Sequence, residues 1–263
     1  MTIALLSKSD LSIFNKRLLN YKLAHAEKDY LLAIVSKIIN ESSLRKKLVF
    51  KGGTAIHHCY LTQSRFSEDL DFTSLDKSIS LEEVKIVLES HDFLEVKKDY
   101  VSAATIKIER LKYSGPLGLP NSLRVEIDFL QNVILPAKAM IYKNAWGIKA
   151  KAMVMDIREI CAEKIRAASD RARYRDFYDL FLLLENFDFD MEEIEGLIRK
   201  KEIRKPIGKK YILKNWKIAN KEKEAELGRI HYARNISDSE IEGMIKNLKL
   251  KPVQRGKKNP PFN

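Results

Sequence analysis

Two aspartates separated by one residue, Asp69 and Asp71, have the types and spacing of metal ligands. Apolar and acidic residues alternate around them, which predicts a half-buried strand over residues 65–72 with Leu70 and Phe72 facing the core. Residues i and i+2 of a strand project to the same side, roughly 7 Å apart at their Cα atoms. Both carboxylates can therefore bind a hard cation such as Mg²⁺, whose oxygen ligands lie at about 2.1 Å. Alone, the pair is equally typical of a solvent-facing strand.

A glycine turn precedes this acidic pair. Gly52-Gly53-Thr54 lies between an apolar run, residues 48–50, and a predicted helix over residues 55–61. Glycine allows close backbone approach, and free N–H groups at a helix start favour an anion such as phosphate. Such turns are common, so the argument depends on both features together. Asp69 follows Gly53 by 16 residues, which leaves room for one helix and a returning strand.

A third carboxylate is needed to hold two metal ions, and one more strand supplies two candidates. In the predicted strand over residues 123–130, Glu126 and Asp128 share one face, while the apolar residues between them share the other. The pattern does not separate the two. Either can instead form a surface ion pair with Arg124 or Arg110.

The elements that must position these residues divide the chain near residue 150. The first part combines predicted helices and strands, with helices over residues 9–41 and 80–90 and strands over residues 93–99 and 105–113. The second part has helical periodicity from residue 147 onward. Its predicted helices cover residues 156–173, 175–185, 191–200, 209–227 and 237–248. We expect an α+β fold, with a small mixed sheet flanked by helices and followed by a helical C-terminal half.

The expected domains are a core over residues 1–150, a helical domain over 151–250 and a disordered basic tail over 251–263. The net charge of +12 is unevenly distributed. Residues 199–263 hold 19 Lys or Arg against 7 Asp or Glu, a balance of +12, so residues 1–198 are neutral. A basic C-terminal quarter favours a polyanionic partner, although it is also compatible with a basic tail that has no ligand.

The same sequence argues against a membrane or secreted protein. The first residues are too short an apolar run for a signal peptide, and no stretch approaches the roughly 20 apolar residues of a membrane span. The two cysteines, Cys59 and Cys161, lie in helix-like patterns without metal-ligand spacing. We therefore expect a cytoplasmic protein.

Four segments together resemble the AbiEii/AbiGii-type nucleotidyltransferase toxins, which belong to the DNA polymerase beta-like superfamily. The segments are Phe50-Lys51-Gly52-Gly53-Thr54-Ala55, Arg65-Phe66-Ser67-Glu68-Asp69-Leu70-Asp71-Phe72, Glu159-Ile160-Cys161-Ala162-Glu163-Lys164-Ile165-Arg166-Ala167 and Arg175-Asp176-Phe177-Tyr178-Asp179-Leu180. The wider superfamily has Gly-Ser where this chain has Gly53-Thr54, which keeps the hydroxyl. The resemblance does not extend to the last eighty residues.

The resemblance implies roles for individual residues. Asp69 and Asp71 would be catalytic and hold Mg²⁺ or Mn²⁺, with Glu126 or Asp128 as further metal ligand. Lys164 and Asp176 would match catalytic motif residues beyond the sheet, in a helical domain that completes the active site. The predicted nucleotide-binding set is Lys51, Gly52, Gly53, Thr54, Arg65, Ser67 and Lys164.

Several of these residues have ordinary alternatives. Lys164 lies in an otherwise apolar helical stripe, where a lysine either extends to solvent or meets an anion such as a triphosphate. Asp176 can bond Lys164, position an acceptor or pair with Arg173, and Asp179 can pair with Arg175. Arg65 can neutralise phosphate charge or pack against Glu68.

The expected function is transfer of a nucleotide from an NTP to an RNA acceptor, such as the 3′ end of tRNA, which would block translation. The resemblance also implies a cognate antitoxin of winged-helix type. One alternative keeps the enzyme but changes the acceptor to a protein hydroxyl or a small molecule. Another is a non-catalytic RNA-binding protein in which the two aspartates have no chemical role.

Overall fold

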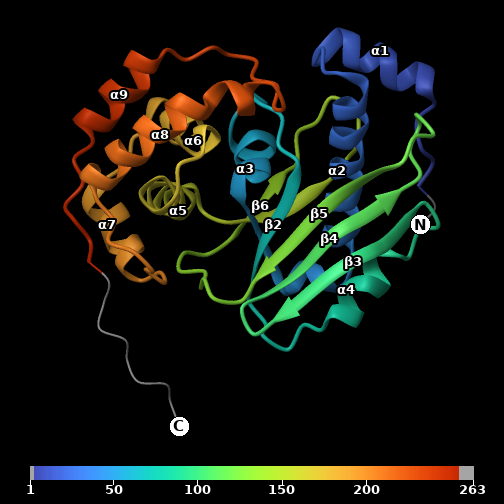
Figure 1. Cartoon of the computed structure of the whole chain (residues 1–263). Helices are drawn as coiled ribbons and strands as arrows, with labels where there is room; N and C mark the ends of the chain where they lie inside the picture. The colour runs from blue at the N-terminus through green and yellow to red at the C-terminus, as the bar shows by residue number, and fades with distance from the viewer. Residues whose placement is uncertain (1–2, 255–263) are drawn as a thin grey trace. The chain divides into compact units, whose positions relative to one another are not determined.

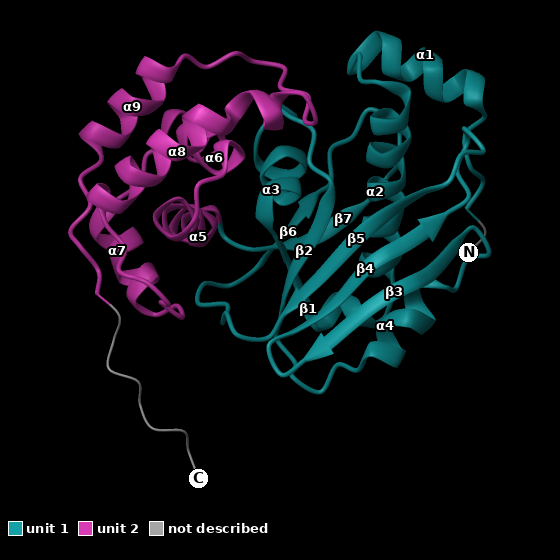
Figure 2. Ribbon diagram, viewed as in Figure 1, with its two compact units in different colours: residues 1–156 teal, residues 157–263 magenta. Residues whose placement is uncertain are grey.

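The computed structural model describes residues 3–254 of the chain. The chain divides into two compact units, residues 1–156 and residues 157–263 (Figure 2). The first unit contains the sheet and the second is helical. None of the helices in the described part of the chain is long and apolar enough to cross a membrane.

A mixed sheet in the order β3-β4-β5-β2-β1-β7-β6 forms the centre of the first unit (Figure 1). The β2–β5 and β1–β7 pairs are parallel and the other neighbours are antiparallel. The strands are β1 (Leu48–Lys51), β2 (Asp69–Ser74), β3 (Leu94–Ser102), β4 (Thr105–Tyr113), β5 (Asn121–Asp128), β6 (Lys138–Ile141) and β7 (Lys151–Val154). The predicted small mixed sheet is confirmed.

Helix α2 (Leu23–Glu41) covers one face of this sheet and contacts β2, β5 and β7 (Figure 1). The apolar residues of β2 and β5 are at most 2 % exposed and form the core. Because side chains alternate along a strand, the acidic residues between them project from the opposite face. The remaining helices of the unit are α1 (Lys8–Leu18), α3 (Gly52–Ala55), which continues as a π-helical turn (Ile56–Tyr60), and α4 (Leu81–Leu88), with a 3₁₀ turn at Ser43–Lys46.

The predicted single helix over residues 9–41 is wrong, because the chain breaks between α1 and α2. Asn20 has a positive φ of 55°. The Asn15 side chain accepts a hydrogen bond from the Tyr21 amide and donates one to the Tyr21 carbonyl. These bonds compete with the helical pattern and end α1.

Two strand predictions also need correction. Strand β2 begins at Asp69, four residues later than predicted, because the buried Arg65 donates from Nη1 to the Phe66 carbonyl and shapes the preceding segment. Strands β6 and β7 fall where the periodicity predicted no strand, and the helical part accordingly begins at Ile157. The predicted helix over residues 80–90 is observed as α4, and the Ser80 side chain caps it by accepting a hydrogen bond from the Glu83 amide.

The helical unit contains α5 (Ile157–Asp170), α6 (Tyr174–Asn186), α7 (Met191–Arg199), α8 (Lys209–Leu227) and α9 (Asp238–Asn247), close to their predicted bounds. Phe177 of α6 packs against Trp216 of α8 with ring centroids 5.3 Å apart. Within the predicted disordered tail, Val253 is buried and forms a β-bridge with Ile207. Residues 255–263 of that tail lie outside the described residues.

Candidate active site

The glycine turn follows directly from strand β1 and contacts the acidic pair. Gly52 has a positive φ of 78°, a conformation that L side chains rarely adopt. A Cβ atom placed on Gly52 would overlap the Oδ2 atom of Asp71. Asp71 is also the register partner of Lys51, at the end of β1. The turn and Asp71 therefore belong to one site, and glycine is required where they meet.

Gly53 is surrounded by two other predicted nucleotide-binding residues. A Cβ atom on Gly53 would overlap the Nη2 atom of Arg65 and lie 3.0 Å from the Ser67 hydroxyl. Arg65 is only 2 % exposed, so a guanidinium group is held against the turn out of bulk water. A buried cation beside the backbone amides of a glycine turn suits a bound phosphate. Glu68, the alternative partner of Arg65, lies 3.6 Å from Arg124 Nη2, and the two roles weighed for Arg65 stay predictions.

Thr54 joins the start of the helix to the acidic strand. Its hydroxyl donates to the Asp69 carbonyl oxygen at 2.5 Å and lies 2.9 Å from the Ser67 hydroxyl. With 1 % exposure, the side chain fixes the position of β2 against α3. Its predicted contact with the triphosphate stays a prediction.

The register of the sheet places further charged residues beside the acidic pair. On the parallel strands β2 and β5, Asp69 pairs with Arg124, Asp71 with Glu126, and Thr73 with Asp128. Register partners on parallel strands project from the same face. Glu126 is therefore the direct neighbour of Asp71 across the strands, and Asp128 is one pair further along.

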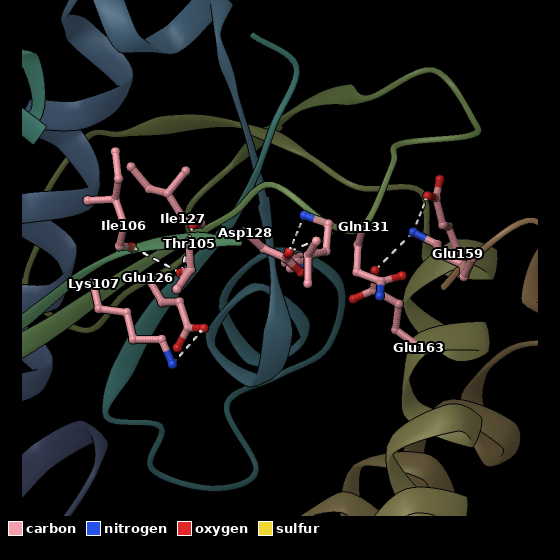
Figure 3. Close-up of polar contacts among 12 residues, drawn as sticks. Thr105, Ile106, Lys107, Glu126, Ile127, Asp128, Gln131, Glu159 and Glu163 are labelled. Atoms are coloured by element: carbon pink, nitrogen blue, oxygen red, sulfur yellow. Dashed lines mark hydrogen bonds and ion pairs between the residues drawn. The ribbon is translucent and has the colours of Figure 1, made fainter. Parts of the chain in front are cut away.

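Three carboxylates of this face have a basic partner. Arg124 Nε lies 3.0 Å from Asp69 Oδ1, Lys107 Nζ lies 3.2 Å from Glu126 Oε1, and Lys51 Nζ lies 3.0 Å from Asp128 Oδ2. Figure 3 shows the Lys107–Glu126 pair on neighbouring strands. The sequence offered Arg124 or Arg110 as the ion-pair partner of Glu126 or Asp128. The observed partners are Lys107 for Glu126 and Lys51 for Asp128. The roles of Lys107 and Arg124 were missed because they depend on cross-strand register.

Asp128 also has a structural task that Glu126 lacks. Its Oδ1 atom accepts hydrogen bonds from the Leu130 and Gln131 amides, at 2.8 and 3.2 Å, and so caps the turn after β5 (Figure 3). With Oδ2 bound to Lys51, both oxygens of Asp128 are engaged. The geometry favours Glu126 as the third carboxylate.

The donor set fits a hard divalent cation, although in residues 3–254 no three His, Cys, Asp or Glu side chains are gathered closely enough to hold one. Carboxylates on one face of two adjacent strands are the ligand type that Mg²⁺ prefers. Gly52 leaves room at Asp71 that any side chain would fill. Two neighbouring acids repel unless a positive group lies between them, and in this arrangement basic side chains provide that charge.

In the helical unit, Lys164 meets two acids of its own unit. The residue is 8 % exposed, and its Nζ lies 3.3 Å from Asp176 Oδ1 and 2.7 Å from Asp179 Oδ2. Arg171 also bonds Asp176, at 2.7 Å. Of the two alternatives for Lys164, an anion is therefore the partner. Of the three alternatives for Asp176, the hydrogen bond to Lys164 is observed, and Arg171 is a further partner.

The charge of Asp176 is set by this network. Burial alone would raise the pKa of Asp176, but Lys164 and Arg171 outweigh it and lower the pKa to about 2. The carboxylate is therefore ionised at neutral pH and holds the Lys164 ammonium in a fixed position. The catalytic roles predicted for Lys164 and Asp176 stay predictions.

A second buried ion cluster in this unit was not predicted. Lys201 is 5 % exposed, and its Nζ contacts Glu159 Oε1 at 2.5 Å and Glu163 Oε1 at 2.9 Å. Glu159 is fully buried. Figure 3 shows Glu159 and Glu163 on the same helix. The only available signal was the i, i+4 spacing of the two acids, which does not identify a distant lysine.

The sequence matches the family model described as "Nucleotidyl transferase AbiEii toxin, Type IV TA system" over residues 33–247. No curated protein matches the sequence. Among solved structures, MenT4, a nucleotidyltransferase toxin from Mycobacterium tuberculosis H37Rv, is 23 % identical with a TM-score of 0.56, covering 78 % of this chain and 70 % of that one. An antigenic nucleotidyltransferase-like protein from Paracoccidioides brasiliensis is 15 % identical with a TM-score of 0.43, covering 86 % of this chain and 93 % of that one.

The likeness to MenT4 supports the fold of the chain. The family model covers both the glycine turn with the acidic strand and the helices that carry Lys164 and Asp176. The chain therefore belongs to the AbiEii family, the nucleotidyltransferase toxins of type IV toxin–antitoxin systems.

Proposed function

We propose that this nucleotidyltransferase uses Mg²⁺ to transfer a nucleotide from an NTP to an RNA acceptor, such as the 3′ end of tRNA, and thereby blocks translation in the cytoplasm. The observation that carries the proposal is the contact between Gly52 and Asp71. It brings the glycine turn and the acidic strand together. Nucleotidyl transfer needs both groups at the same phosphate chain.

The reaction is an in-line displacement at the α-phosphorus of the NTP. The acceptor hydroxyl oxygen forms a bond to this phosphorus, and the bond from the phosphorus to the oxygen bridging to the β-phosphate breaks. Pyrophosphate leaves, and the hydroxyl proton passes to one of the carboxylates on the acidic face. Mg²⁺, held by Asp69, Asp71 and Glu126, would stabilise the negative charge of the attacking and leaving oxygens.

The chain's own residues bind and orient the leaving group. The amides of Gly52 and Gly53 face the β- and γ-phosphates, and the buried Arg65 adds a fixed positive charge beside them. Ser67 and Thr54 hold the turn against β2 through their hydroxyl contacts. Lys51, at the end of β1, contributes a second cation close to Asp71.

The RNA acceptor is supported by charge in the helical unit. Four exposed lysines follow one another along α8 at helical spacing: Lys210, Lys214, Lys217 and Lys221. Neutralisation of phosphates by such side chains dominates affinity for nucleic acids and makes it depend on salt. The same charge disfavours a cationic small-molecule acceptor.

A type IV system also contains an antitoxin, and the family therefore implies such a partner for this toxin. We propose a DNA-binding protein of winged-helix type, encoded beside the toxin. Co-expression tests this directly. Growth arrest caused by the toxin gene should be relieved by the neighbouring reading frame and not by an unrelated DNA-binding protein.

Transfer of label from α-labelled NTPs tests the proposed activity. Each of the four nucleotides is incubated with the protein and with total RNA, purified tRNA or a protein extract. Label in tRNA that requires magnesium and is lost in Asp69→Ala supports the proposal. Label in protein would show that the acceptor is a protein hydroxyl. Absence of transfer by the native chain with every nucleotide and acceptor, while RNA binding survives in Asp69→Ala, would favour a non-catalytic RNA-binding protein.

A further inference from the structure

A pocket on the exposed face of β4 and β5 lies beside the acidic pair. Its volume is about 420 Å³, and it is lined by Lys107, Ile108, Glu109, Arg124, Val125 and Glu126. This volume lies within the range of ligand-binding pockets. The pocket is not part of the glycine turn, which lies on the β1 side of β2.

The register orders the groups across the sheet. Lys51, Asp71, Glu126 and Lys107 are consecutive partners on β1, β2, β5 and β4. Neighbouring strands are about 4.8 Å apart, so Lys107 is two strands, or roughly 10 Å, from Asp71. The carboxylates thus lie between the phosphate turn on one side and the pocket on the other.

The pocket owes its shape to a β-bulge. Ile108 pairs with Val125 and Leu111 pairs with Leu123, so that two residues of β4 oppose Arg124 alone. A bulge bends the strand and redirects side chains next to it. Glu109, within the bulge, forms an ion pair with Lys98, while Lys107 and Arg124 remain on the side of Asp69 and Glu126.

The chemistry of the proposed reaction determines what this pocket receives. In an in-line displacement, the attacking hydroxyl approaches opposite the departing pyrophosphate. The pyrophosphate lies at the glycine turn, on the β1 side. The acceptor must therefore reach the α-phosphorus from the β5–β4 side, where the pocket lies.

We propose that Lys107 and Arg124 form an acceptor subsite that binds the terminal phosphodiester of the RNA strand and so positions its hydroxyl. This inference rests on the proposed function. The Lys107 side chain is 38 % exposed and that of Arg124 is 58 % exposed, so a ligand can reach both cations. The planar guanidinium of Arg124 suits bidentate contact with phosphate, and Lys107 adds a point charge.

Ion pairs with carboxylates hold the side chains of Lys107 and Arg124 in place in the absence of RNA. Arg124 contacts Asp69 and Glu68, and Lys107 contacts Glu126. Two of these carboxylates, Asp69 and Glu126, belong to the acidic face that is proposed to hold the metal. A cation that already neutralises such a carboxylate needs only a small side-chain movement to contact a phosphate beside it. Lys107 and Arg124 are therefore positioning residues that act on the acceptor.

Equilibrium binding of a 5′-labelled single-stranded RNA octamer to the full chain, with magnesium and without nucleotide, tests this subsite. Lys107→Gln and Arg124→Gln should each weaken binding at least about fivefold at low salt. Each should also lower the slope of log K against log salt by about 0.7, the contribution of one phosphate contact on a single strand.

Lys112→Gln is the matched control. Lys112 is a lysine of β4 whose side chain is 47 % exposed, and it contacts Glu95 at 3.7 Å away from the acidic pair. This variant should bind RNA like the native chain. Its affinity for a non-hydrolysable NTP in the absence of RNA should also change by less than about twofold.

Two negative results have different meanings. If the native chain binds the octamer and both pocket variants bind it equally well with the same salt slope, the two cations are cross-strand ion pairs only and the subsite is overturned. If the native chain does not bind RNA at any salt concentration, the RNA acceptor of the proposed function is overturned together with the subsite.

Discussion

Asp71 of β2 lies directly opposite Glu126 of β5 on neighbouring parallel strands, and both side chains project from the face that α2 leaves open. Asp128, the other candidate, is one pair further along the sheet, with one oxygen on Lys51 and the other capping a turn. Register and hydrogen bonding thus separate two residues that the strand pattern leaves equivalent.

The different surroundings of Glu126 and Asp128 predict a large loss of activity for one conservative substitution and a small loss for the other. Glu126→Gln should lower kcat for nucleotidyl transfer by about 100-fold or more, because it removes a negative charge beside Asp71. Asp128→Asn keeps the oxygen that caps the turn and should keep kcat within about tenfold. Single-turnover rates with labelled NTP measure both. A larger loss in Asp128→Asn than in Glu126→Gln would show that the assignment is reversed.

Gly52→Ala should reduce the rate of nucleotidyl transfer much more than it reduces the free energy of unfolding. Its positive φ costs an alanine about 1–2 kcal/mol, and the new Cβ would also overlap Asp71. Gly118→Ala is the matched control, because Gly118 has a φ of 66° with no atom within 4 Å of the added Cβ. Gly52→Ala should lose at least as much stability in urea as Gly118→Ala, but only Gly52→Ala should lose about 100-fold in transfer rate. Equal activity of the two variants would argue against contact between the turn and the acidic strand.

The acid stability of the helical unit should depend on Asp176. A carboxylate whose folded pKa is lowered from 3.8 to about 2 adds stability that is complete above pH 4 and is lost as pH falls toward 2. The shift corresponds to about 2 kcal/mol. Urea unfolding of the native chain and Asp176→Asn should therefore differ most at neutral pH and converge between pH 4 and pH 2. A pH-independent difference between the native chain and Asp176→Asn would exclude this linkage.

Removal of Lys201 should leave two buried carboxylates without their cation. Lys201→Met is expected to reduce the free energy of unfolding by about 3–5 kcal/mol. Adding Glu159→Gln and Glu163→Gln should restore part of this loss, since the uncompensated charges are then removed. Lys205→Met, at a lysine whose side chain is 65 % exposed and which pairs with Asp170, should cost less than about 0.5 kcal/mol. A much smaller loss in the free energy of unfolding of Lys201→Met would mean that a local segment unfolds in the variant. Solvent would then reach the two carboxylates.

Much of the fold could be predicted from local patterns. The alternation of β2, β4 and β5 and the caps of α4 and α9 act within a few residues, and these elements lie close to where the sequence predicts them. The errors concern elements that are stabilised by distant partners. Strand β7 has four residues and pairs with β1, about a hundred residues earlier, so no local period reveals it.

The candidate site shows the same division. The turn at Gly52 and the pair Asp69 and Asp71 have recognisable types and spacing within one short segment. Lys107 and Arg124 do not, because a lysine on a strand is ordinary until the register places it beside Glu126. Arg65 was recognised as a candidate, but its burial against Gly53 follows only from the fold.

Calorimetric titration with magnesium and a non-hydrolysable NTP tests the central claim most directly, since the claim is that the glycine turn and the acidic strand bind one Mg-NTP together. The native chain is compared with the double variant Asp69→Asn/Asp71→Asn, each with and without magnesium. The account predicts that magnesium strengthens NTP binding to the native chain at least about tenfold, or ~1.4 kcal/mol, and has no such effect on the double variant. Equal binding by both chains in magnesium would contradict it.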